Sequence, residues 1–119
     1  MEKKLVLIVD DDYTVTSMLR RLFLLEGFNV QTARDGEEGL ECAKARQPDL
    51  VLLDYNLPGR DGIEVLRDLK RLYADIKIIM ITGTDDETLQ NKAVQAGADF
   101  LSKPLAVHEL RARAQDLTH

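Results

Sequence analysis

Short, continuously apolar segments alternate along the chain with segments whose apolar residues recur at helical spacing. Three of the apolar runs, residues 5–9, 50–53 and 78–81, consist almost wholly of Leu, Val and Ile. Runs of this kind are typical of strands that are buried on both faces of a sheet. Residues 28–33 instead alternate apolar with polar side chains, and residues 100–102 form only a short run, so we expect these two segments to be edge strands.

Between the runs, five segments carry apolar residues at spacings of three and four, the pattern of amphipathic helices. Gly27 and Gly97 stand where the first and fourth helices should end. Residues 35–38 (Asp-Gly-Glu-Glu) form a capping-box-like start for the second helix. The predicted inner faces are Val15, Met18, Leu19, Leu22 and Phe23; Leu40 and Ala43; Gly62, Val65, Leu66, Leu69, Leu72 and Tyr73; Leu89, Ala93 and Ala96; and Val107, Leu110, Ala114 and Leu117.

Strict alternation of five strands with five helices predicts an α/β fold. We expect a doubly wound, five-stranded parallel sheet with helices on both faces and right-handed crossovers. Placing the two weaker strands at the edges gives the flavodoxin-like order 2-1-3-4-5. Such sheets bind ligands beyond the carboxyl ends of their strands, near the switch point between strands 1 and 3. We therefore expect one domain over residues 1–119, with its functional site at that edge.

Charge and composition argue against several classes of protein. With 16 basic and 21 acidic residues, the net charge of −5 opposes non-specific attraction to nucleic acid or to anionic membranes. The longest apolar run is far shorter than the roughly 20 residues of a membrane span, and the chain opens on no signal-peptide pattern. The one cysteine, Cys42, has no partner for an internal disulfide. We expect a cytoplasmic protein that binds neither nucleic acid nor membranes directly.

Polar residues follow four of the five predicted strands. Aspartates occupy positions 10–12 after the first strand, and Asp54, Thr82 and Lys103 follow the third, fourth and fifth. Carboxylates a few ångströms apart repel one another, which favours a cation between them. Oxygen ligands with open positions suit Mg²⁺, which retains water and phosphate oxygens. We therefore expect a phosphoryl substrate, with Lys103 and Thr82 stabilising its charge and one carboxylate left as a possible nucleophile.

Five motifs connect these positions to a known family. They are Ile-Val-Asp-Asp-Asp at 8–12, Leu-Asp-Tyr-Asn-Leu-Pro-Gly-Arg-Asp-Gly at 53–62, Ile-Thr-Gly at 81–83, Ala-Gly-Ala-Asp at 96–99 and Ser-Lys-Pro at 102–104. In this order and spacing, the chain resembles the receiver domain of two-component response regulators, the chemotaxis-regulator-like fold. The resemblance covers essentially the whole chain, and the motifs are specific together although each is weak alone.

The resemblance implies that Asp54 is the phosphoacceptor, with a Mg²⁺ ion beside it. Asp11 and Asp54 would bind the ion directly, Asp10 would act mainly through water, and the main-chain carbonyl of Asn56 would complete the protein ligands. Three consecutive acids leave two possible registers for the metal-binding pair. We prefer Asp10 and Asp11, because Asp12 then falls where an acid can cap the first helix.

The resemblance also implies roles for residues after the fourth and fifth strands. Lys103 resembles the lysine that pairs with the phosphoryl group, and its bond to Pro104 is typically cis in relatives. Thr82 resembles the switch hydroxyl, and Gly83 the small residue that leaves room for the phosphoryl donor. Phe100 stands where relatives carry a conformationally coupled aromatic, more often tyrosine.

The implied function is phosphorelay signal transduction. A sensor histidine kinase or phosphotransfer protein would supply the phosphoryl group from a phosphohistidine to Asp54. The surface of the fourth helix, fifth strand and fifth helix would then change and control a downstream output domain or protein, with a homodimer on phosphorylation as one possibility. Such a chain promotes its own phosphorylation and slow dephosphorylation, but it is not a turnover enzyme.

Two alternatives remain from the sequence. Residues 10–14 (Asp-Asp-Asp-Tyr-Thr) fit the signature of haloacid-dehalogenase-like phosphatases, in which Asp10 would be the nucleophile and Asp12 the acid/base. That interpretation leaves Asp54 without a role and lacks a later acidic pair for Mg²⁺. The second alternative is a pseudo-receiver, an interaction module that works without phosphorylation.

Overall fold

In the described part of the chain, five strands and five helices alternate along the sequence. A computed structural model describes residues 3–83 and 86–119. The strands are β1 (Leu5–Val9), β2 (Asn29–Ala33), β3 (Leu50–Asp54), β4 (Lys77–Thr82) and β5 (Asp99–Ser102). The helices are α1 (Tyr13–Leu25), α2 (Gly36–Ala45), α3 (Gly62–Leu72), α4 (Glu87–Gln95) and α5 (Val107–Thr118).

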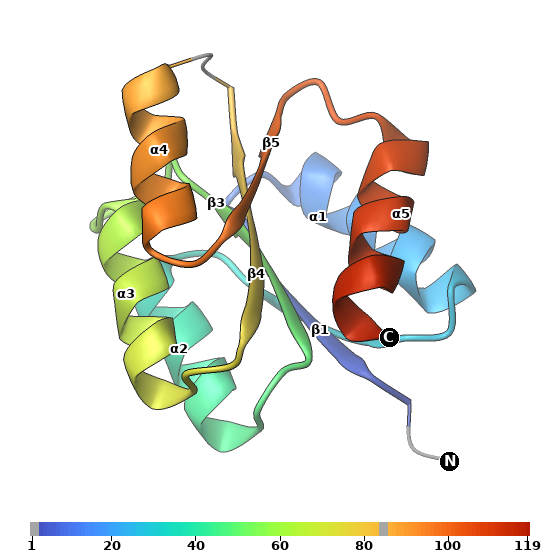
Figure 1. Cartoon of the computed structure of the whole chain (residues 1–119). Helices are drawn as coiled ribbons and strands as arrows, with labels where there is room; N and C mark the ends of the chain where they lie inside the picture. Colours follow the sequence, from blue (N-terminus) through green and yellow to red (C-terminus); the bar gives the residue numbers. More distant parts are fainter. Residues whose placement is uncertain (1–2, 84–85) are drawn as a thin grey trace.

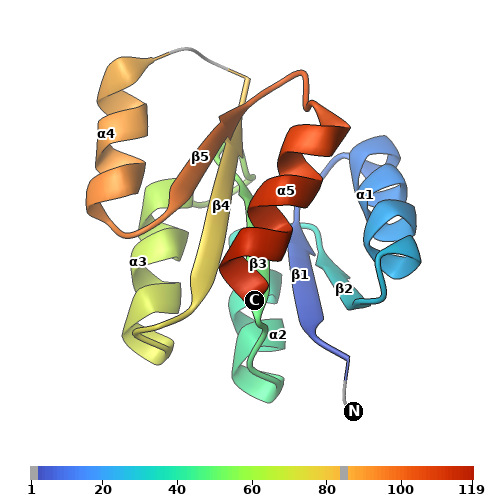
Figure 2. The ribbon, with the colours of Figure 1, turned by 45° about the vertical axis from the view of Figure 1, so that its right-hand side comes forward.

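All strand pairs in the sheet are parallel, and the strands lie in the order β2-β1-β3-β4-β5. Helices α2, α3 and α4 cover one face of the sheet, and α1 and α5 cover the other (Figures 1 and 2). The predicted doubly wound fold and strand order are confirmed. The three continuously apolar strands are central, because only there do helices on both faces remove every side chain from water.

Two hydrophobic cores hold the layers together, one on each face of the sheet. On the side of α2, α3 and α4, the core includes Leu7, Leu53 and Leu66. On the side of α1 and α5, it includes Ile8 and Phe23. Successive residues of a strand point to opposite faces, so β1 contributes Leu7 to one core and Ile8 to the other.

Aspartates begin four of the five helices. Asp12 accepts hydrogen bonds from the amides of Thr14 and Val15, which confirms its predicted cap on α1. Asp35, Asp61 and Asp86 cap α2, α3 and α4 in the same way, whereas α5 begins at Ala106 without a side-chain cap. Carboxylates at these positions satisfy free amides and interact favourably with the helix dipole.

Three residues of the predicted inner faces are exposed instead. Met18, Leu72 and Val107 have exposed fractions of 47%, 38% and 41%. Met18 lies about 100° around α1 from the buried Leu19, which is outside the narrow stripe that a helix on a sheet can bury. These three apolar side chains therefore lie on the solvent-facing surface of their helices. Within the described ranges, no helix is long and apolar enough to cross a membrane.

Candidate functional site

Three carboxylates meet at the carboxyl edge of the sheet. Asp10 follows β1, Asp54 ends the neighbouring β3, and both are buried, with 4% of each residue exposed. Asp11 is exposed beside them. One ligand oxygen from each of the three lies within 4.8 Å of the others, a spacing that could hold a metal ion. The parallel register creates this cluster, because it carries the ends of β1 and β3 to the same edge.

The carboxyl group of Asp10 is held in an environment that disfavours its charge. Burial raises its pKa to about 6 from an ordinary value of 3.8, and the nearby charge of Asp54 contributes to the rise. The amide of Asp12, which donates to Asp10 Oδ1 at 2.9 Å, and the ammonium of Lys103 oppose it. A cation at this edge would favour the ionised form of Asp10 and so fits the donor set.

We expect the metal-free protein to lose stability as the pH rises from about 4 to about 6. In that window the folded chain holds the Asp10 proton more tightly than the unfolded chain, so proton release on raising the pH disfavours folding. Urea unfolding in a chelator, of the parent chain and of Asp10→Asn, measures the effect. The free energy of unfolding of the parent should fall relative to the variant across the window and level off above it; a constant difference would contradict this assignment.

Lys103 directly follows β5, and its side chain lies close to the acidic cluster. Its Nζ lies 3.5 Å from Asp54 Oδ2 and 3.9 Å from Asp10 Oδ2, and its side chain is 33% exposed. Its amide donates to the carbonyl of Thr82 at 2.7 Å, which fixes the chain where it leaves β5. The bond from Lys103 to Pro104 is cis, as expected. The ammonium therefore lies close to both buried carboxylates.

Other predicted site residues lie on or just after the strands β3, β4 and β5. Thr82 is fully buried at the end of β4, one residue past Ile81, which is paired with Asp54 in the sheet. The amide of Asn56 donates to Asp54 Oδ1 at 3.2 Å. Phe100 is half-buried and packs against the core on the α4 side of the sheet. Thr82, Asn56 and Lys103 thus lie at or just beyond the carboxyl ends of three different strands, β4, β3 and β5.

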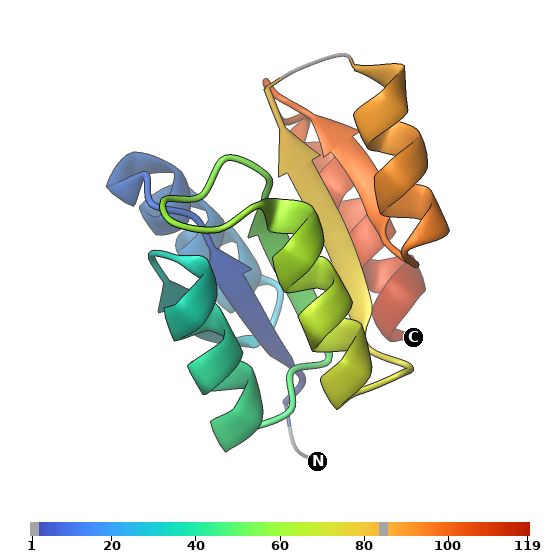
Figure 3. The same cartoon turned by 90° about the vertical axis from the view of Figure 1, so that its left-hand side faces the viewer.

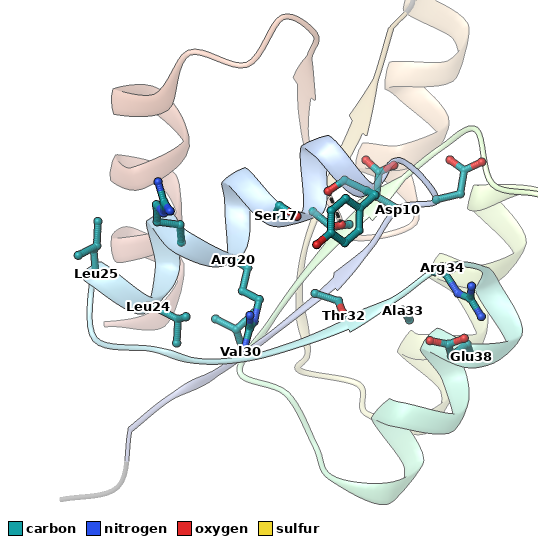
Figure 4. A pocket seen from close by; sticks show the side chains of 14 residues that line it. Asp10, Ser17, Arg20, Leu24, Leu25, Val30, Thr32, Ala33, Arg34 and Glu38 are labelled. Atoms are coloured by element: carbon teal, nitrogen blue, oxygen red, sulfur yellow. Dashed lines mark hydrogen bonds between the residues drawn. The ribbon is translucent and has the colours of Figure 1, made fainter.

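One hollow in the described surface touches the acidic cluster at one end only. It is a groove of about 980 Å³ between α1 and β2, with Asp10 toward one end and Leu24 and Leu25 at the other (Figure 4). Thr82 and Lys103 do not line it. The predicted site residues therefore gather at the acidic cluster rather than along this groove.

A comparison with families of known proteins shows which family the chain belongs to. The model of the response regulator receiver domain matches residues 6–115. The chain belongs to the response regulator receiver family. This places it in two-component signalling and does not support the phosphatase alternative. In agreement with the receiver interpretation, Asp12 is used as the cap of α1 and the cluster contains Asp10, Asp11 and Asp54.

Individual relatives agree with the receiver assignment. Response regulator MprA of Mycolicibacterium vanbaalenii is 40% identical over 113 residues, which are 94% of this chain and 49% of that protein. The receiver therefore spans about half the length of the curated relatives it matches. A CheY-like receiver domain from Methanospirillum hungatei superposes with a TM-score of 0.92 at 30% identity, covering 97% of this chain and 93% of the other. Chemotaxis protein CheY4 of Vibrio cholerae gives 0.91 at 27% identity, covering 98% and 99%.

One residue of the motif at 53–62, Arg60, makes contacts that the sequence did not predict. Arg60, in the loop between β3 and α3, contacts Glu37 of α2 and both Glu64 and Asp68 of α3. Only the contact with Glu64 has a helical spacing that a pattern could suggest. Glu37 is 23 residues away, so nothing short of the fold brings it to Arg60.

Proposed function

We propose that this receiver accepts a phosphoryl group on Asp54 and acts as a phosphorylation-controlled switch. The observation that carries the proposal is the cluster of Asp10, Asp11 and Asp54 with the ammonium of Lys103 beside it. A purely structural cap or strand end needs no second and third carboxylate at this spacing. A phosphoryl acceptor does, because these carboxylates can bind a cation. That cation and the ammonium of Lys103 would compensate the negative charge on both sides of the transferred group.

The donor set fits Mg²⁺. Asp11 and Asp54 would hold the ion directly, Asp10 would act mainly through water, and the main-chain carbonyl of Asn56 would complete the set. When bound, Mg²⁺ supplies positive charge to the phosphoryl oxygens. The exposure of Asp11 beside two buried acids leaves the site open to solvent and to a donor.

The proposed transfer uses a phosphohistidine of a sensor histidine kinase or phosphotransfer protein. A carboxylate oxygen of Asp54 attacks phosphorus, a new P–O bond forms, and the P–N bond to the imidazole breaks. The imidazole leaves with the electron pair of that bond and takes up a proton. Lys103, already 3.5 Å from Asp54 Oδ2, would pair with the oxygens of the transferred group.

The proposed output begins at Thr82. Its hydroxyl would bond the new oxygens on Asp54, and Phe100 on the neighbouring strand would move inward as Thr82 moves. The surface of α4, β5 and α5 would change as a result and control an output domain or protein, with dimer formation as one form of control. We propose that this occurs in the cytoplasm and that the receiver turns over no diffusible substrate.

Removal of the metal is expected to stop phosphorylation. Incubated with a small acyl phosphate and Mg²⁺, the chain should gain a single phosphoryl group in its intact mass. In an excess of chelator the gain should be lost, because three carboxylates without a cation repel the anionic donor. Equal phosphorylation in both conditions would contradict the metal site, and no phosphorylation in either would favour the pseudo-receiver alternative.

A further inference from the structure

The loop between β3 and α3, residues 55–61, carries the main-chain carbonyl of Asn56 and is fixed at both ends. The amide of Tyr55 donates to the carbonyl of Ile81 at 2.9 Å. At the other end, a Cβ on Gly62 would lie 2.8 Å from the Cα of Tyr55, so the start of α3 is packed directly against the start of the loop. Figure 3 shows the loop lying beside the starts of α2 and α3.

Arg60 lies at the α3 end of this loop and joins the loop to both helices. Its Nη1 lies 2.9 Å from Glu37 Oε1 of α2, and its Nη2 lies 2.6 Å from Asp68 Oδ2 of α3. Its Nε faces Glu64 Oε2 at 3.7 Å. Three nitrogens of one planar group therefore meet three carboxylates from two helices, an arrangement that the fork of arginine permits and the single ammonium of lysine does not.

The guanidinium lies in a partly enclosed position. Only 25% of the Arg60 side chain is exposed, and 28% of Asp68. Hydrogen bonds from Arg60 lower the pKa of the Asp68 carboxyl, and those to Asp68 and Glu37 raise the pKa of Arg60. Ion pairs of this shared, forked kind order a chain more firmly than an isolated pair on the surface.

Only three residues, Leu57, Pro58 and Gly59, separate Asn56 from Arg60 in the chain. Pro58 has a fixed φ, and Gly59 turns the chain at a φ of +84°, a conformation that other residues rarely adopt. A Cβ on Gly36 would lie 2.6 Å from Val65 Cγ2 and 3.7 Å from the Cβ of Arg60, so α2 packs tightly against α3 and lies next to the loop.

We propose that Arg60 is a positioning residue for the metal site, setting the place of the Asn56 carbonyl by joining the loop to α2 and α3. This inference rests on the proposed Mg²⁺ site. The inference gives Arg60 a role in Mg²⁺ affinity. Arg60 itself lies outside the donor set and carries a charge that repels a cation. Loss of that charge alone would strengthen Mg²⁺ binding, so a weaker affinity in a variant that remains folded indicates lost positioning.

The test compares Arg60→Met with Arg71→Met. Arg71 also contacts Asp68, at 2.7 Å, but it lies on α3 with 76% of its side chain exposed and does not reach the loop. Mg²⁺ affinity of the unphosphorylated chain is measured by calorimetric titration, and amide exchange at Asn56 by NMR. We expect Arg60→Met to bind Mg²⁺ about tenfold more weakly and to exchange the Asn56 amide faster, the range seen when groups that orient metal ligands are removed. Arg71→Met should stay within about twofold of the parent.

A third variant separates positioning from general loss of stability. Arg60→Lys keeps the charge but can satisfy fewer of the three carboxylates, so its affinity should fall between those of the parent and Arg60→Met. Urea unfolding of all variants shows whether each remains folded under the titration conditions. Parent-like affinity in Arg60→Met, or an equal loss in Arg71→Met, would overturn the inference while leaving the proposed function intact. Absence of Mg²⁺ binding in the parent would overturn the proposed metal site and this inference with it.

Discussion

Asp54→Asn is expected to abolish phosphorylation of this receiver. The amide has nearly the same shape as the carboxylate, so the buried position at the end of β3 can still be filled. It cannot supply the anionic oxygen that attacks phosphorus, and it removes one of the three charges that favour a cation. Intact mass after incubation with a small acyl phosphate and Mg²⁺ should show the added phosphoryl group on the parent chain and not on the variant.

Asp12→Asn is the matched control for Asp54→Asn. It makes the same chemical change at an aspartate that directly follows Asp10 and Asp11 in the chain, but Asp12 caps α1 through the amides of Thr14 and Val15, a role that asparagine also performs. We expect phosphorylation at close to the parent rate. If Asp12→Asn were inactive and Asp54→Asn active, the roles assigned to the two acids would be wrong.

Lys103→Met is expected to slow phosphorylation by about 100-fold, the cost of removing one group that stabilises charge in a transition state. Lys103 Nζ is 3.5 Å from Asp54 Oδ2, so its loss leaves the transferred oxygens without that cation. The same substitution removes an interaction that lowers the pKa of Asp10, so Asp10 should hold its proton to a higher pH. The rate of mass gain at several pH values measures both effects.

Lys77→Met serves as the control for Lys103→Met. Lys77 begins β4, at the opposite end of the strand from Thr82, and its side chain is exposed. The same loss of one positive charge there should leave the rate within about twofold, because exposed charges far from the site are screened. Equal slowing in both variants would show that net charge, rather than the position of Lys103, controls the reaction.

The fold could be predicted because its signals are local. Apolar runs such as residues 50–53 report burial on both faces, and the alternation in residues 28–33 reports an edge strand. Strand order then follows from which strands are central. The same reasoning placed Asp10, Asp54, Thr82 and Lys103 at one edge, since parallel strands bring their carboxyl ends together.

What the sequence could not predict depends on contacts between distant residues. Periodicity placed Met18 on the buried face of α1, but the width of the stripe that is covered depends on how the helix lies on the sheet. The raised pKa of Asp10 arises from burial among other strands, which no local pattern encodes. Likewise, the link from Arg60 to Glu37 exists only once α2 and α3 pack side by side.

The most direct test of the account is to locate the phosphoryl group on the chain. Borohydride reduces an acyl phosphate of aspartate to homoserine, which marks the modified position in peptide mass spectra. After incubation of the parent chain with an acyl phosphate and Mg²⁺, we expect the mark at position 54 alone. A mark at position 10, or a phosphorylated chain without any mark at position 54, would contradict the central claim.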